Sequence, residues 1–241
     1  HSLFQYINRT ATPIGKQHLA NWFNAHLDNK EAIEHRQEAI RELSADLEYR
    51  QQIRLLGLLY KGKPADTTEI KEWATSPSYY RKRTLLRILP TAVTVINVLC
   101  ISLAILGIIS ASIAGGVFVS FVLFSTIFSK GITKLQTTYG EKLQILSTYA
   151  DQILLTEQKE MHSHILQELK ADLTSQNQTA SQAVRQLSKL MNALDQRSNL
   201  LMSSILNGLI FWELRQVMRI EKWKEIHASD LPRWIETIGE I

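Results

Sequence analysis

The sequence predicts an all-α fold, an elongated helical bundle that combines a long lever-like or coiled-coil-like helix with an apolar helical hairpin. Gly and Pro account for only 10 and 5 of the 241 residues, and helix-forming Leu, Ala, Gln, Glu and Lys are abundant. Residues 88–129, a stretch of 42 positions, carry no charge. Residues 180–223, a stretch of 44 positions, contain no Pro and one Gly. These three observations favour helices along the whole chain.

The first 60 residues predict three consecutive helices. The first is expected over residues 13–27, because the Thr12 hydroxyl can cap a helix and Pro13 suits the first helical position. The second is expected over residues 28–47 and the third over residues 48–60, since apolar side chains recur there at helical spacing.

The uncharged residues 88–129 predict a hairpin of two apolar helices. A membrane-spanning helix needs about 20 apolar residues, so the stretch is long enough for two spans with a turn within residues 107–116. Basic residues lie at both ends, which is typical of a hairpin whose two ends face the cytoplasm. This basic flank could contact lipid headgroups or phosphates, and it comprises Arg81, Lys82, Arg83, Arg87, Lys130 and Lys134.

The composition of the hairpin also fits a second location. A helix that is apolar on every side is found either in a membrane or in a buried core. The first location predicts a protein at the cytoplasmic face of a membrane. The second, a hairpin buried in a soluble bundle or in a dimer interface, predicts a cytoplasmic protein. We favour the membrane, because a bundle of 241 residues rarely surrounds so long an uncharged stretch on all sides.

The chain after the hairpin predicts amphipathic lever helices. A seven-residue rhythm of apolar positions begins at Leu187, which is typical of a coiled coil and fits a homodimer. A continuous helix over residues 180–223 would be about 65 Å long. A last helix is expected to begin near Pro232. The chain therefore divides into three predicted regions: an N-terminal helical part, 1–80, the hairpin region, 81–135, and the lever region, 136–241.

The sequence presents no catalytic, cofactor-binding or metal-binding pattern. The Gly15–Lys16 pair resembles the end of a phosphate-binding loop, but Thr10 and Gln17 replace the Gly and the Ser or Thr that such a loop requires. His162 and His164 are two residues apart, so on a helix they would point in different directions. We therefore expect this chain to have no enzyme activity, cofactor or metal of its own. The net charge of +4 is too small to indicate a nucleic-acid partner by itself.

Residues 7–46 resemble the start of the core, or lever, domain of the MutS family of mismatch-recognition ATPases. The matching pattern is Thr-x-Thr-Pro-x-Gly, then Leu and an aromatic-rich helix, then Ile-x-x-Arg and an apolar-x-x-Leu. The residues that carry it are Thr10, Thr12, Pro13, Gly15, Leu19, Trp22, Ile33, Arg36, Ile40 and Leu43. The final residues 234–241, "WIETIGEI", resemble the helix that leads into the ATPase domain of that family.

The resemblance implies a non-catalytic lever fragment that couples a C-terminal ATPase domain, outside this chain, to DNA or to membrane-side elements. It implies ATP and Mg²⁺ for the parent protein, DNA contacts through that protein, and a homodimer. Because a hairpin occupies the interval of the DNA-encircling clamp, the chain is most similar to shorter, membrane-associated MutS-like proteins. His1 leads us to expect a piece of a longer protein. The alternative is a membrane-anchored helical scaffold or coiled-coil interaction protein unrelated to DNA.

Overall fold

The computed structural model describes residues 2–59, 67–143, 145–174, 179–195 and 200–241. Their regular structure is helical, apart from one isolated bridge between Thr174 and Thr179, which confirms the all-α prediction. The chain divides into two compact units. The motif unit comprises His1–Thr75, Lys142–Ser188 and His227–Ile241, and the hairpin unit comprises Ser76–Glu141 and Lys189–Ile226.

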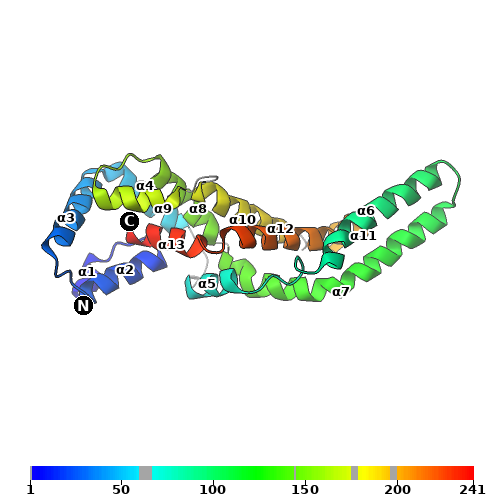
Figure 1. Ribbon diagram of the computed structural model, residues 1–241, viewed down its shortest axis with the longest axis horizontal. Helices are drawn as coiled ribbons and strands as arrows, with labels where there is room; N and C mark the ends of the chain where they lie inside the picture. The colour runs from blue at the N-terminus through cyan, green and yellow to red at the C-terminus, as the bar shows by residue number, and fades with distance from the viewer. Residues whose placement is uncertain (1, 60–66, 144, 175–178, 196–199) are drawn as a thin grey trace. The chain divides into compact units, whose positions relative to one another are not determined.

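The motif unit is built around its last helix, α13 (Leu231–Glu240), which contacts α2, α5, α8 and α9 (Figure 1). Trp73, Tyr149, Leu166 and Trp234 are among its fully buried side chains. The other helices of this unit are α1 (Leu3–Ile7), α2 (Pro13–Asn24), α3 (Lys30–Ala45), α4 (Leu47–Leu59), α5 (Thr67–Thr75), α8 (Ile145–Gln158), α9 (His164–Leu173) and most of α10 (Ala180–Asp195).

The predicted helix starts agree with the local chemistry. Thr12 caps α2, since its Oγ1 atom accepts a hydrogen bond of 3.1 Å from the Gly15 amide, and Pro13 is the first helical residue. Asn29 caps α3 by accepting a hydrogen bond from the Glu31 amide. The helix α5 was not expected, because its residues are mostly polar, and burial of Ile70 and Trp73 stabilises it.

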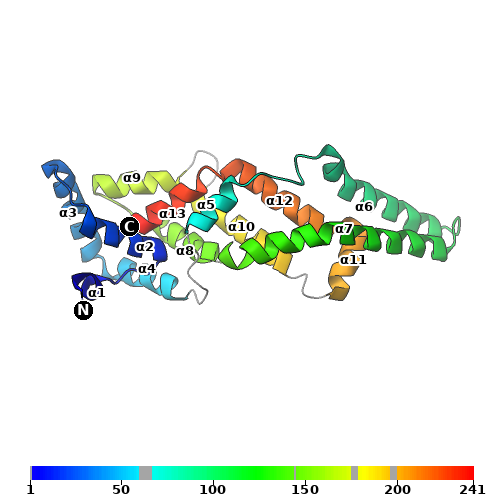
Figure 2. The same ribbon diagram turned by 90° about the horizontal axis from the view of Figure 1, so that it is seen from below.

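The hairpin unit contains the two predicted apolar helices. These are α6 (Thr84–Ile105) and α7 (Ala111–Leu143), and the turn between them includes Gly107, whose positive φ of 73° suits glycine. Helix α11 (Leu200–Ile210) runs across the hairpin rather than along it, and α12 (Trp212–His227) follows (Figure 2). The turn lies within the predicted interval, whereas α7 continues well past residue 129.

The prediction of one continuous helix over residues 180–223 is wrong. Helix α11 ends at Ile210 and α12 begins at Trp212, because Phe211 has a left-handed backbone with φ 52°. Such a backbone costs about 1–2 kcal/mol in a residue other than glycine. The buried Phe211 ring packs against Phe121, Phe124 and Phe128, which offsets that cost. The predicted continuity over residues 196–199 lies outside the described residues.

Candidate functional site

The N-terminal motif meets the last helix of the motif unit. Gly239 of α13 makes the closest approach to α2, since a Cβ atom there would lie 2.6 Å from Ile14 Cγ1. A Cβ at Gly15 would be 3.6 Å from the Gly239 carbonyl oxygen and 3.0 Å from Thr12 Oγ1. Two glycines, one from each end of the sequence, therefore let α2 and α13 pack closely. The importance of Gly239 had no distinct signal in the sequence.

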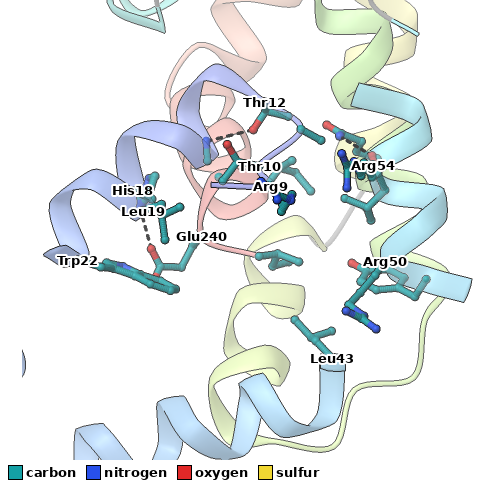
Figure 3. Close-up of a pocket in the computed structure, with 18 residues that line it drawn as sticks. Arg9, Thr10, Thr12, His18, Leu19, Trp22, Leu43, Arg50, Arg54 and Glu240 are labelled. Atoms are coloured by element: carbon teal, nitrogen blue, oxygen red, sulfur yellow. Dashed lines mark hydrogen bonds and ion pairs between the residues drawn. The ribbon is translucent and has the colours of Figure 1, made fainter. Parts of the chain in front are cut away.

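Two carboxylates of α13 receive side chains from three other helices. His18 of α2 contacts both, and its Nε2 atom lies 2.8 Å from Glu236 Oε2. Its Nδ1 atom lies 2.7 Å from Glu240 Oε2, the contact marked in Figure 3. Arg36 of α3 lies 3.5 Å from Glu240 and also stacks 4.3 Å above the Trp22 ring. We call this group of contacts the α13 clasp. Trp22 and Arg36 were predicted motif residues, but the contact of Arg36 with the last helix was not predicted.

The clasp is completed by Lys71 of α5, which forms an ion pair with Glu236. Partial burial acts to raise the pKa of Glu236, but hydrogen bonds from Lys71 and His18 outweigh it and leave this pKa below its ordinary value. Glu236 is therefore held as a carboxylate at neutral pH. Because both ring nitrogens of His18 face carboxylates, the protonated ring can donate to both of them.

A cavity of about 400 Å³ opens beside the clasp (Figure 3). Thr10, Leu19 and Trp22 line it, together with Ile241 at the end of α13. Three exposed arginines at its edge are Arg9, Arg50 and Arg54. Among the described residues, no group of three His, Cys, Asp or Glu side chains could hold a metal ion. The contacts of the clasp position α13 against α2, α3 and α5.

Tyr49, which lines this cavity, contacts α8. The Tyr49 hydroxyl and Thr156 Oγ1 are 2.9 Å apart, and burial raises the pKa of Tyr49 to about 12. Glu42 accepts hydrogen bonds from the amides of His162 and Ser163, at 2.9 and 2.7 Å, just before α9. These contacts hold α3, α4, α8 and α9 around the clasp.

The predicted basic flank is divided between several roles in the hairpin unit. Arg81 Nε is 2.6 Å from Glu225 Oε2, and the Arg83 guanidinium lies 4.3 Å above the Tyr79 ring. Lys82 and Arg87 are exposed. The side chains of Lys130 and Lys134 lie outside the described residues. Arg81 and Arg83 thus have partners within the fold, which the sequence alone could not show.

The segment that leads into α6 is fixed by a buried carboxylate. Glu221 of α12 accepts backbone hydrogen bonds from Tyr79, Tyr80 and Arg81 at 2.7, 3.1 and 2.6 Å. Desolvation, and secondarily the Glu221 charge, raise the pKa of Tyr80 above its ordinary value. A single Glu in a polar helix gives no sequence signal for such a role.

Helix α11 is fastened to the hairpin by polar groups. Asn97 Nδ2 of α6 donates to the carbonyl oxygens of Gly208 and Leu209 at 2.9 and 3.1 Å. Arg215 donates to the Pro90 carbonyl oxygen and to Thr94 Oγ1 at 3.0 and 2.7 Å. Gly208 is required here, because a Cβ atom would lie 2.5 Å from the Phe118 and Val122 side chains.

The two helices of the hairpin are long and apolar enough to cross a membrane, by length and composition. Of the most apolar window in Thr84–Ile105 only 17% is buried, and of that in Ala111–Ser129 only 6%. The hairpin is therefore not buried in the core of this chain. Two such helices are weak evidence for association with a membrane.

Comparison with protein families matches residues 1–200 of the chain to MutS domain III. A search of curated proteins and a search of solved structures each found no match. The matched residues include the whole N-terminal motif and the hairpin.

Proposed function

Because the chain belongs to the MutS domain III family, we propose that it is the non-catalytic lever part of a MutS-like mismatch-repair ATPase. In this proposal the chain transmits the nucleotide state of a C-terminal ATPase domain, which lies outside these residues, to a hairpin at a membrane surface. ATP and Mg²⁺ are bound by that domain and not by this chain. DNA is bound through the parent protein, which acts as a homodimer.

The observation that carries the proposal is the α13 clasp. A lever transmits a displacement only if its end is rigidly seated, since a loose helix would absorb the motion. Glu236 and Glu240 are held by His18, Arg36 and Lys71 from three separate helices. A displacement of α13 therefore pulls on α2, α3 and α5 together. This supports a mechanical role for residues that resemble the entry into the ATPase domain.

The membrane-side part of the proposal rests on the exposed hairpin. Leu99, Ile105, Ile108 and Ile113 are each more than half exposed. Monomeric soluble proteins rarely expose contiguous apolar surface of this kind, so the hairpin is a surface for lipid or for another chain. We assign it to lipid, which places the protein at the cytoplasmic face of a membrane.

The test uses the full-length parent protein with the double substitution E236Q/E240Q. Neutral amides keep the size of the carboxylates but remove the charges that three helices share. We expect ATP hydrolysis to continue, while the effect of ATP on DNA affinity falls by about tenfold, the scale of a coupling free energy of 1–2 kcal/mol. The matched control is E31Q/E38Q, which removes two exposed carboxylates from α3 in the same unit.

If ATP changed DNA affinity equally in the E236Q/E240Q protein and the unsubstituted protein, the proposed lever role of the α13 clasp would be contradicted. Absence of salt-dependent DNA binding by the unsubstituted full-length protein would favour the membrane-anchored scaffold instead. Light scattering of the same protein in detergent checks the homodimer.

A further inference from the structure

The hairpin has a free tip that no described residue of its unit buries. Helix α11 reaches α6 at Asn97, and it reaches α7 where Gly208 abuts Phe118 and Val122. All of residues 98–117 are described, and none of them is buried. Large apolar side chains dominate the exposed surface of this tip: Val98, Leu99, Ile101, Ile105, Ile108 and Ile113.

The free tip has the depth of one lipid leaflet. From Val98 to Ile105, α6 rises by about 12 Å at 1.5 Å per residue. The hydrocarbon core of a bilayer is about 30 Å thick, so one leaflet contributes about 15 Å. The tip and its turn therefore fill one leaflet and are too short to cross both.

Charged side chains contact helix α11, which itself contains no charged residue. Glu213 and Arg215 follow it closely in the sequence. Because α11 runs across the hairpin, both ends lie at a similar depth (Figure 2). Charged side chains are costly at the centre of a bilayer and are tolerated at its surface.

A two-span arrangement would bring the Arg215 guanidinium close to the centre of the bilayer. If residues 88–105 crossed the hydrocarbon core, Asn97 would lie near the midplane with α11 bound to it. Thr94, which accepts the Arg215 hydrogen bond, is only about 4.5 Å along the helix from Asn97.

We propose that the hairpin enters one leaflet only, with residues 98–117 among the acyl chains and α11 in the plane of the interface. This inference rests on the proposed association with a membrane and replaces the expected pair of spans with a single-leaflet anchor. Arg87 comes ten residues before Asn97 in the sequence and then lies about 15 Å outside the hydrocarbon. At that distance salt screens most of the attraction between its charge and the lipid headgroups. Acyl-chain burial rather than basic charge holds the protein on the membrane.

The test places reporters at two depths in a C100S background, which removes the one cysteine of this chain. The variant I108C reports on the turn, and L85C, at a residue 84% exposed at the start of α6, is the matched control. The full-length protein is added to vesicles of phosphatidylcholine with a minor share of phosphatidylglycerol. Flotation measures binding, and a membrane-impermeant maleimide is supplied either outside the vesicles or trapped inside.

The single-leaflet anchor predicts that L85C reacts with maleimide supplied outside the vesicles. I108C should react at least about tenfold more slowly than L85C, whichever side the maleimide is on, because water is excluded from the hydrocarbon. A fluorophore attached at position 108 should be quenched most by spin labels near the ends of the acyl chains. Reaction of vesicle-bound I108C with the trapped reagent would overturn the single-leaflet anchor but leave the membrane proposal intact. Failure of the protein to float would overturn both.

Discussion

The two units of this chain place their charges in opposite ways. In the motif unit the carboxylates of the α13 clasp are partly exposed, and the core is apolar and aromatic. In the hairpin unit Glu213, Glu221 and Lys224 are buried, while the apolar side chains of the tip face outward. Among the described residues every buried Asp, Glu, Lys or Arg belongs to the hairpin unit. The hairpin unit therefore buries charged side chains, whereas the described charged side chains of the motif unit remain at least partly exposed.

The comparison is tested most strongly by W234A, because Trp234 of α13 is 2% exposed. Loss of a buried aromatic side chain should lower the free energy of unfolding of the motif unit by about 3–5 kcal/mol. Urea unfolding followed by tryptophan fluorescence measures the change. Y6A removes an aromatic side chain that is 78% exposed in the same unit, and it should change stability by about 0.5 kcal/mol or less. Equal losses in the two variants would contradict an aromatic core around α13.

The buried charges of the hairpin unit are tested by E221Q. The amide nitrogen of the substituted glutamine cannot accept a hydrogen bond. At least one of the three backbone amides that donate to Glu221 therefore loses its acceptor. We expect a loss of about 2–3 kcal/mol, the scale of an unsatisfied buried group and a lost charge. Hydrogen exchange of residues 79–81 locates the effect.

E225Q is the control for that variant, since Glu225 holds Arg81 at the surface of the same helix. It should cost about 1 kcal/mol or less. If E225Q were the more damaging substitution, buried charge would not be what fixes the start of α6.

A pair of glycine substitutions separates the covered base of the hairpin from its free tip. At Gly208 a Cβ atom would lie 2.5 Å from Phe118, whereas at Gly116 it would meet nothing within 4 Å. G208A should therefore lower the thermal stability of the hairpin unit by about 1 kcal/mol, because overpacking outweighs the gain in helix propensity. G116A should be neutral or slightly stabilising. Destabilisation by G116A would show that something packs on the tip.

The smallest effect concerns the pH dependence of the motif unit. Burial acts to raise the pKa of Glu42, but the amide hydrogen bonds of His162 and Ser163 outweigh it, so this pKa lies below its ordinary value. A carboxyl with a lowered folded pKa adds stability above its unfolded pKa of about 4.3, and that stability is lost as pH falls through the folded value. Unfolding free energies measured from neutral to acidic pH should thus fall less steeply in E42Q than in the unsubstituted protein. Parallel curves of unfolding free energy against pH in the two proteins would show that Glu42 does not contribute to this pH dependence.

Local features of the fold could be predicted from the sequence. The Thr12 cap and the turn of the hairpin depend on residues that are close neighbours in the chain, and both are confirmed. The break at Phe211 could not be predicted, since it depends on three phenylalanines of α7 that are distant in sequence. The clasp was missed for the same reason, because His18 and Glu236 are 218 positions apart.

The seating of α13 by α2 also sets an order of events on the ribosome. Synthesis runs from the N-terminus, so α2 and the hairpin emerge long before α13 exists to occupy its place. The apolar tip is thus presented to its surroundings while the motif unit is still open. We expect nascent chains that end after α12 to reach vesicles already, and to resist protease in the motif unit only once α13 has been added. Protease resistance before α13 emerges would show that the unit closes without its last helix.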